Sequence, residues 1–156
     1  MKSGIIVAVI MLVALVVRMS AQSAETKKID EFEDFGCEEV KARTENLYLQ
    51  LIKTAGSHGY IMVYEGKIRF SWPREHYLLP HIGEANSRIR AIKTYIDFLK
   101  ISKFPVTILF GGYREHLEAE YFLVPPGGTT PTPLPTLKRI KHRKGRPVFY
   151  ANPAEC

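Results

Sequence analysis

Two stretches of the chain carry apolar residues at helical spacing. The clearer stretch is 85–99, in which five apolar residues recur at intervals of four and three: Ala85, Ile89, Ile92, Ile96 and Leu99. This pattern predicts a helix of about four turns with one buried face. The second stretch is 37–55, where Val40, Leu47 and Leu51 fit one face of a helix. Two amphipathic helices are therefore expected.

Short apolar runs bounded by turn residues predict the strands. The runs are 59–64, 106–110 and 118–124, and we expect the last two to pair as a terminal hairpin. Residues 27–36 alternate charged with apolar side chains, which predicts a short first strand. Residues 67–82 are irregular and contain prolines and scattered aromatic residues, which favours a long surface loop or a hairpin.

The predicted elements follow each other in the order (β)αβαββ, with the first strand in brackets because its pattern is the weakest. Helices that alternate with strands ahead of a terminal hairpin are typical of an α/β protein. We therefore expect an α/β two-layer sandwich, in which two helices pack on one face of a mixed sheet of three or four strands.

The first 24 residues have a character of their own. Lys2 is followed by an apolar run from Ile5 to Val17 and then by small residues from Ser20 to Ala24. This order indicates a secretory signal peptide over 1–24, because a membrane span needs about 18 or more apolar residues. We expect an exported protein, periplasmic or extracellular, with no transmembrane span after cleavage. Retention as an uncleaved anchor is the alternative.

The net charge of +6 is concentrated near the C-terminus, where six of the nine residues from 138 to 146 are Lys or Arg. A run rich in proline and threonine precedes them, so we divide the remaining chain into one domain, 25–126, and a linker with a mobile basic tail, 127–156. Such a tail would attract anionic envelope polymer by charge, or act only as a solubilising segment. Interleaved aromatic residues are missing before Phe149, so specific nucleic-acid binding is not expected.

The two cysteines, Cys37 and Cys156, both lie beyond the predicted signal peptide. Disulfides persist outside the cytosol, so a bridge between these cysteines would attach the end of the chain to the domain. The alternative is a buried apolar Cys37 and a free thiol at Cys156.

Three features in the second half of the chain suggest a family. Arg88 comes early in the second predicted helix, Tyr95 lies further along it, and the strand 106–113 ends in a glycine-rich turn. With the order of elements, they make the segment 59–124 resemble a diverged OmpA-like, peptidoglycan-associating domain. The resemblance implies that Arg88 and Glu65, the latter near the position of a family Asp, contact a peptidoglycan peptide. The Leu-Ser pair of the family pattern is missing.

The chain also resembles small exported bacterial proteins of unassigned function, through its Gly-Tyr-Ile strand and its Gly-Gly-Tyr-Arg-Glu turn. That resemblance implies export and assigns no ligand.

Residue chemistry supports some of the same positions. A guanidinium at Arg88, near a helix N-terminus, would add a bidentate donor to an end that already favours anions. The alternative is a surface ion pair between Arg88 and Glu84, four residues earlier. Tyr113 and Arg114 follow the glycine pair 111–112 and are candidate ligand contacts at the end of a strand. Alternatively, the glycines only permit a tight turn.

Motifs for catalysis or metal binding are weak. His116, Glu118 and Glu120 alternate along one strand and allow a surface metal site, but a solvated outer face is favoured because only one imidazole is present. The sequence contains neither a His-x-x-x-His pair nor a Gly-x-Ser-x-Gly elbow. No enzymatic activity and no cofactor are therefore predicted.

The combined expectation is a non-enzymatic exported domain that binds cell-envelope material, either peptidoglycan or another anionic polymer. The alternative is a protein–protein interaction module whose contact surface is the 67–82 loop, with Phe70, Trp72 and Tyr77. A hydrolase whose catalytic residues form no known motif is a third alternative.

Overall fold

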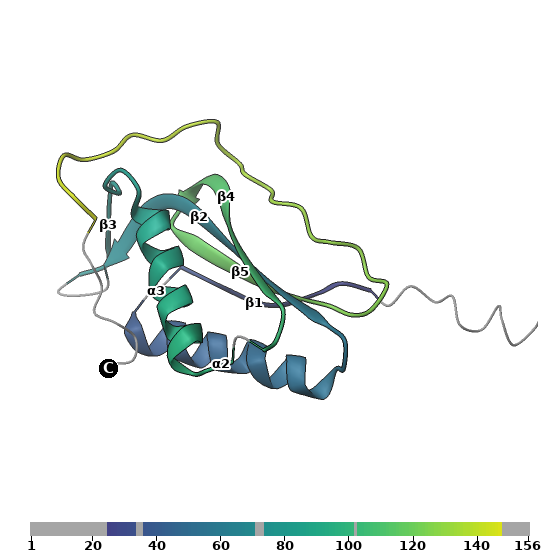
Figure 1. The fold of residues 1–156 in the computed structure, drawn as a ribbon. Helices are drawn as coiled ribbons and strands as arrows, with labels where there is room; N and C mark the ends of the chain where they lie inside the picture. Colours follow the sequence, from purple (N-terminus) through teal and green to yellow (C-terminus); the bar gives the residue numbers. More distant parts are fainter. Residues whose placement is uncertain (1–24, 34–35, 71–73, 102, 148–156) are drawn as a thin grey trace, which may run out of the picture.

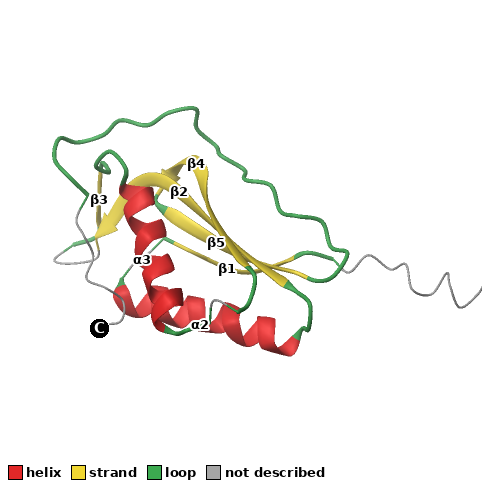
Figure 2. Ribbon diagram, in the orientation of Figure 1, coloured by secondary structure: helices red, strands yellow, loops and turns green. Residues whose placement is uncertain are grey.

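The computed structural model describes residues 25–33, 36–70, 74–101 and 103–147. The predicted signal peptide, Trp72 and Cys156 lie outside these residues, so the predictions that involve them stay predictions. The described chain has two helices and a five-stranded sheet (Figures 1 and 2). The α/β class is thus confirmed, with more strands than the three or four expected.

Both predicted helices and all predicted strands are present, and one further strand is added. The elements in chain order are β1 (Lys27–Phe32), α2 (Cys37–Lys53), β2 (His58–Phe70), β3 (His76–Leu78), α3 (Glu84–Phe98), β4 (Val106–His116) and β5 (Glu118–Val124). β2 and β4 are longer than their apolar runs. The added strand, β3, pairs with the end of β2, so the 67–82 region is a hairpin.

β2 is the central strand of a mixed sheet. β5 pairs with it antiparallel, from His58–Val124 to Tyr64–Glu118, while β4 pairs with it in parallel from Gly59–Val106 onward. Because both partners cover the same part of β2, they lie on its two opposite edges. β1 extends the sheet beyond β5 in antiparallel orientation. The predicted β4–β5 hairpin is therefore wrong: in the described chain, each strand pairs with β2 instead.

A single residue, Leu117, connects β4 to β5, so the chain has to cross β2 at very close range. It crosses at Gly66. The Leu117 amide donates to the Lys67 carbonyl oxygen at 2.9 Å, and a Cβ atom on Gly66 would lie 2.6 Å from the Leu117 nitrogen. Only a residue without a side chain allows two backbones to approach this closely.

The hydrophobic core joins the two helices to the sheet. Apolar residues at alternating positions of β2 and β5 meet the apolar stripes of α2 and α3; the core includes Ile61, Val63, Ala119, Tyr121 and Leu123 from the sheet, with Leu47, Leu51, Ile89, Ile92 and Ile96 from the helices. Each such side chain contributes about 1.5–3 kcal/mol when fully buried. The apolar face predicted for the helix at 85–99 thus packs against the core.

The C-terminal segment, residues 127–147, runs along the sheet and back to the β2–β3 hairpin (Figure 1). The backbone amides of Thr136 and Leu137 donate to the carbonyl oxygen of Tyr113, both at 3.0 Å, and the Arg143 amide donates to Pro80 at 2.9 Å. As far as residue 147, the predicted linker and basic tail are thus hydrogen-bonded to the domain.

None of the helices in the described part of the chain is both long and apolar enough to cross a membrane.

Substitution of Gly66 should test the crossing. Gly66→Ala places a Cβ against the backbone of β4 and should lower the free energy of unfolding by at least about 4 kcal/mol. Gly83→Ala is the matched control: Gly83 has φ +81° but open space around its Cβ position, so only about 1 kcal/mol of backbone strain is expected. Urea unfolding of both variants measures the difference, and similar losses would show that the close approach does not limit the fold.

Candidate functional site

Glu65, predicted to contact a ligand, caps a helix in the structure. Its Oε2 accepts a hydrogen bond from the backbone amide of Ala85 at 3.1 Å. Gly83, the N-cap residue of α3, has no side chain that could do this. The other oxygen, Oε1, lies 2.6 Å from Nε2 of His142 in the C-terminal segment. Glu65 is buried. Its two carboxylate oxygens join β2 to α3 and to the C-terminal segment.

Arg88 is buried with an acidic partner. Its Nη2 lies 3.0 Å from Oε1 of Glu84, and both side chains are at most 2% exposed. The ion pair that the spacing of four allowed is therefore formed, inside the protein rather than on its surface. A carboxylate ligand at Arg88 would have to displace the Glu84 carboxylate from a buried site.

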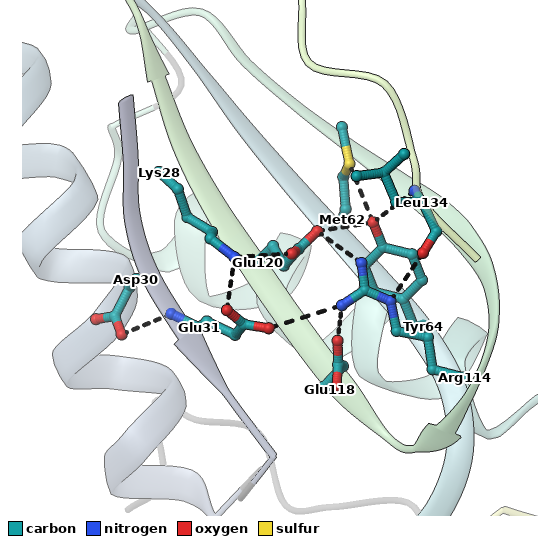
Figure 3. A network of polar contacts seen from close by, with 9 residues as sticks. All are labelled: Lys28, Asp30, Glu31, Met62, Tyr64, Arg114, Glu118, Glu120 and Leu134. Atoms are coloured by element: carbon teal, nitrogen blue, oxygen red, sulfur yellow. Dashed lines mark hydrogen bonds and ion pairs between the residues drawn. The ribbon is translucent and has the colours of Figure 1, made fainter. Parts of the chain in front are cut away.

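Arg114 lies at the centre of a polar network on the sheet (Figure 3). Its guanidinium packs on the Tyr64 ring, 3.5 Å from the ring centroid. It donates to Glu118, to Glu120 at 3.2 Å and to the Leu134 carbonyl oxygen at 3.1 Å. The Arg114 side chain is only 12% exposed. Its charge is thus used within the protein.

Tyr64 and Lys28 complete this network. The Tyr64 hydroxyl donates to Glu120 at 2.7 Å and accepts from the Leu134 amide at 3.2 Å, while Lys28 lies 3.1 Å from Glu120. Burial by itself would raise the pKa of Glu120, but the hydrogen bonds from Tyr64 and Lys28 and the charge of Arg114 outweigh it and hold the pKa below its usual value.

Three carboxylates of this network, those of Glu31, Glu118 and Glu120, lie within 4.8 Å of one another. Lys28 pairs with Glu31 and Glu120, and Arg114 pairs with all three. The protein's own cations thus occupy the position that a metal ion would take. His116, considered as a ligand together with Glu118 and Glu120, contacts Glu33 at 3.4 Å instead.

The glycine pair before Tyr113 does not form a turn but lies inside β4. A Cβ on Gly111 would lie 2.5 Å from the nearest atom of the Tyr64 ring, and Gly112, with φ +102°, packs against Pro135. The glycines therefore admit close neighbours that belong to the chain itself. The Tyr113 ring packs edge-on against Phe110.

A cleft of about 430 Å³ opens between the C-terminal segment and the β2–β3 hairpin. Its lining combines charged with apolar side chains: Lys67, Glu115, Arg139 and Lys141 with Leu79, Pro80, Leu137 and Ile140. Lys67 pairs with Glu115 at 3.4 Å. Arg139 and Lys141 form no ion pair or side-chain hydrogen bond with any residue that the structure describes. The cleft thus presents two available cations beside an apolar wall.

A second, acidic cleft lies around Tyr77, with a volume of about 550 Å³. Its two arginines are paired: Arg43 with Asp30 at 2.9 Å and with Glu39 at 3.1 Å, and Arg69 with Glu75 at 3.3 Å. The Tyr77 ring packs edge-on against His116. This part of the predicted aromatic loop therefore has partners within the protein.

The basic cleft is the site that sequence reasoning missed. The run from 138 to 146 was a visible signal, but its position against Leu79 and Pro80 follows from the docking of the C-terminal segment. The chain matches no protein-family model, and no curated protein or solved structure is significantly similar to it. The OmpA-like resemblance remains a prediction.

The buried ion pair should be visible in stability measurements. Arg88→Met leaves the Glu84 carboxylate without this partner and should lower the free energy of unfolding by about 3 kcal/mol or more. Adding Glu84→Gln removes the charge that was left behind, so the double variant should recover part of this loss. Urea unfolding measures both. Additive losses in the double variant would show that this ion pair does not stabilise the fold.

The network should also make stability depend on pH. Because the folded protein lowers the pKa of Glu120, the ionised carboxylate stabilises the fold above its ordinary pKa of about 4.5, and this contribution is lost as the pH falls through the lower, folded-state value. The free energy of unfolding should fall less steeply below about pH 4.5 in Glu120→Gln than in the wild type. Glu38→Gln, on an exposed side chain, should keep the wild-type slope.

Proposed function

We propose that this protein is an exported, non-enzymatic domain that binds anionic cell-envelope polymer in the basic cleft. The observation that carries the proposal is the pair of cations, Arg139 and Lys141, beside the apolar wall of Leu79, Pro80, Leu137 and Ile140. Buried networks hold the other candidate cations, Arg88 and Arg114. An anionic ligand can therefore bind Arg139 and Lys141 at a lower cost in free energy than Arg88 or Arg114, since no internal ion pair has to break.

The chemistry of the cleft fits a wall peptide. Such a peptide combines carboxylates with short aliphatic side chains, and the cleft combines Arg139 and Lys141 with leucine, isoleucine and proline. Arginine binds a carboxylate in a bidentate manner, while lysine adds a point charge. The basic residues on either side raise the local concentration of any polyanion.

The proposed contact differs from the one that the family resemblance implied. Glu65 takes a supporting role, because its contact with His142 holds the residue next to Lys141. Tyr113 has a similar role, since its carbonyl oxygen binds the amide of Leu137 in the cleft lining. We also infer a two-layer sandwich as the architecture, with the helices on one sheet face and the C-terminal segment along the other.

Two pairs of substitutions that remove equal charge test the site. Arg139→Ser with Lys141→Ser removes the cations that line the cleft, while Lys138→Ser with Lys144→Ser removes two exposed cations outside its lining. In co-sedimentation with purified peptidoglycan, the first pair should weaken binding at least about tenfold and the second about twofold, because only the first removes direct contacts.

Other outcomes would count against the proposal in different ways. Equal losses from the two pairs would show that charge alone attracts the polymer and that the cleft is no site. Absence of wild-type binding would overturn the assignment to peptidoglycan. Loss of binding in Arg88→Lys, with stability retained, would show that the binding site includes Arg88, the residue that the resemblance implied.

A further inference from the structure

The outer edge of β4 has no assigned role. One edge of this strand pairs with β2 along its length. On the other edge, among the residues that the structure describes, only Tyr113 is engaged, through the amides of residues 136 and 137. Residues 106–112 are therefore left as an edge strand with free backbone groups.

Two common protections of an edge strand are missing here, although a register shift interrupts the pairing of β4 with β2 between Phe110 and Gly112. Exposed edges usually carry charged side chains or proline, which discourage pairing with another strand. The segment Val106–Thr–Ile–Leu–Phe–Gly–Gly112 contains neither. β1, the strand at the opposite end of the sheet, has four charged residues among its six. The contrast indicates that β4 has a partner strand.

An exposed aromatic ring and an apolar groove lie close together on this edge. Phe110 is 41% exposed, an unusual position for an aromatic ring in a strand. Two residues earlier, Ile108 lines a groove of about 250 Å³ between β4 and α3, together with Val106, Ile96 and Phe104. Because side chains alternate along a strand, Phe110 and Ile108 point to the same face of the sheet.

We propose that two copies of this protein pair their β4 strands antiparallel about a two-fold axis at Leu109. The ends of the free segment determine this register. Pro105 has no N–H group, and residues 136–137 occupy the edge at Tyr113. Leu109 is the midpoint between these limits, and its neighbours Ile108 and Phe110 both precede the register shift that interrupts β4 before Gly112.

The register makes the surface complementary to itself. Ile108 of one copy lies opposite Phe110 of the other, so each exposed ring covers the mouth of the partner's groove. A two-fold interface requires this kind of reciprocity.

Charge substitutions at the axis test the pairing. Leu109→Glu and Leu109→Lys each place two like charges opposite each other, so each variant alone should be monomeric, with dimer affinity reduced at least about tenfold. Mixed in equal amounts, the two variants should form a heterodimer, because a carboxylate then faces an ammonium. Light scattering after size-exclusion chromatography measures the masses of the purified proteins.

The matched control is Leu49→Glu, on a leucine of α2 that is 52% exposed, and it should leave the dimer intact. Recovery of the dimer on mixing also shows that both Leu109 variants are folded. A monomeric wild type at about 100 μM would overturn the proposal, since even a weak homodimer forms there. So would dimers that survive both substitutions, or variants that stay monomeric when mixed.

Discussion

The passage of the chain over Gly66 is the constraint on which the rest of the structure depends. β4 and β5 are separated by one residue but lie on opposite edges of β2, so the backbone at Leu117 must rest directly on β2. The crossing determines the register of both strands at once. It also brings Arg114, which lies just before the crossing, into contact with Glu118 and Glu120, which lie just after it.

The network around Arg114 holds the C-terminal segment next to this crossing. The guanidinium packs on Tyr64 and pairs with carboxylates, so each charged group of the network has an oppositely charged partner. Tyr64 and Arg114 then both bond the backbone of Leu134. Further along, Tyr113 and Glu65 hold Leu137 and His142. The lining of the cleft between these anchors is therefore hydrogen-bonded to the sheet.

Local patterns predicted the elements well but not how they meet. The spacing of apolar residues located α2, α3 and β5 because helical and strand periodicities are properties of the segment itself. The pattern cannot show that β2 separates β4 from β5, since that depends on Gly66, a residue with no local signal. For the same reason the sequence predicts a turn at the glycines before Tyr113, because their neighbour Tyr64 is distant in the chain. The spacing of Arg88 and Glu84 does predict their ion pair, but it does not show that the pair is buried.

The two proposals together explain why a cleft of modest size could hold a polymer. Glu115, at the cleft, lies six residues along β4 from Leu109, which is about 20 Å at 3.3 Å per residue. The two-fold axis of the proposed dimer would thus separate its two clefts by about 40 Å, at opposite ends of one continuous sheet. A small ligand gains nothing from this arrangement, whereas a repeating polymer that spans both clefts binds the second without losing further translational freedom. Monomeric and dimeric forms should therefore differ in affinity for the polymer but not for a single wall peptide.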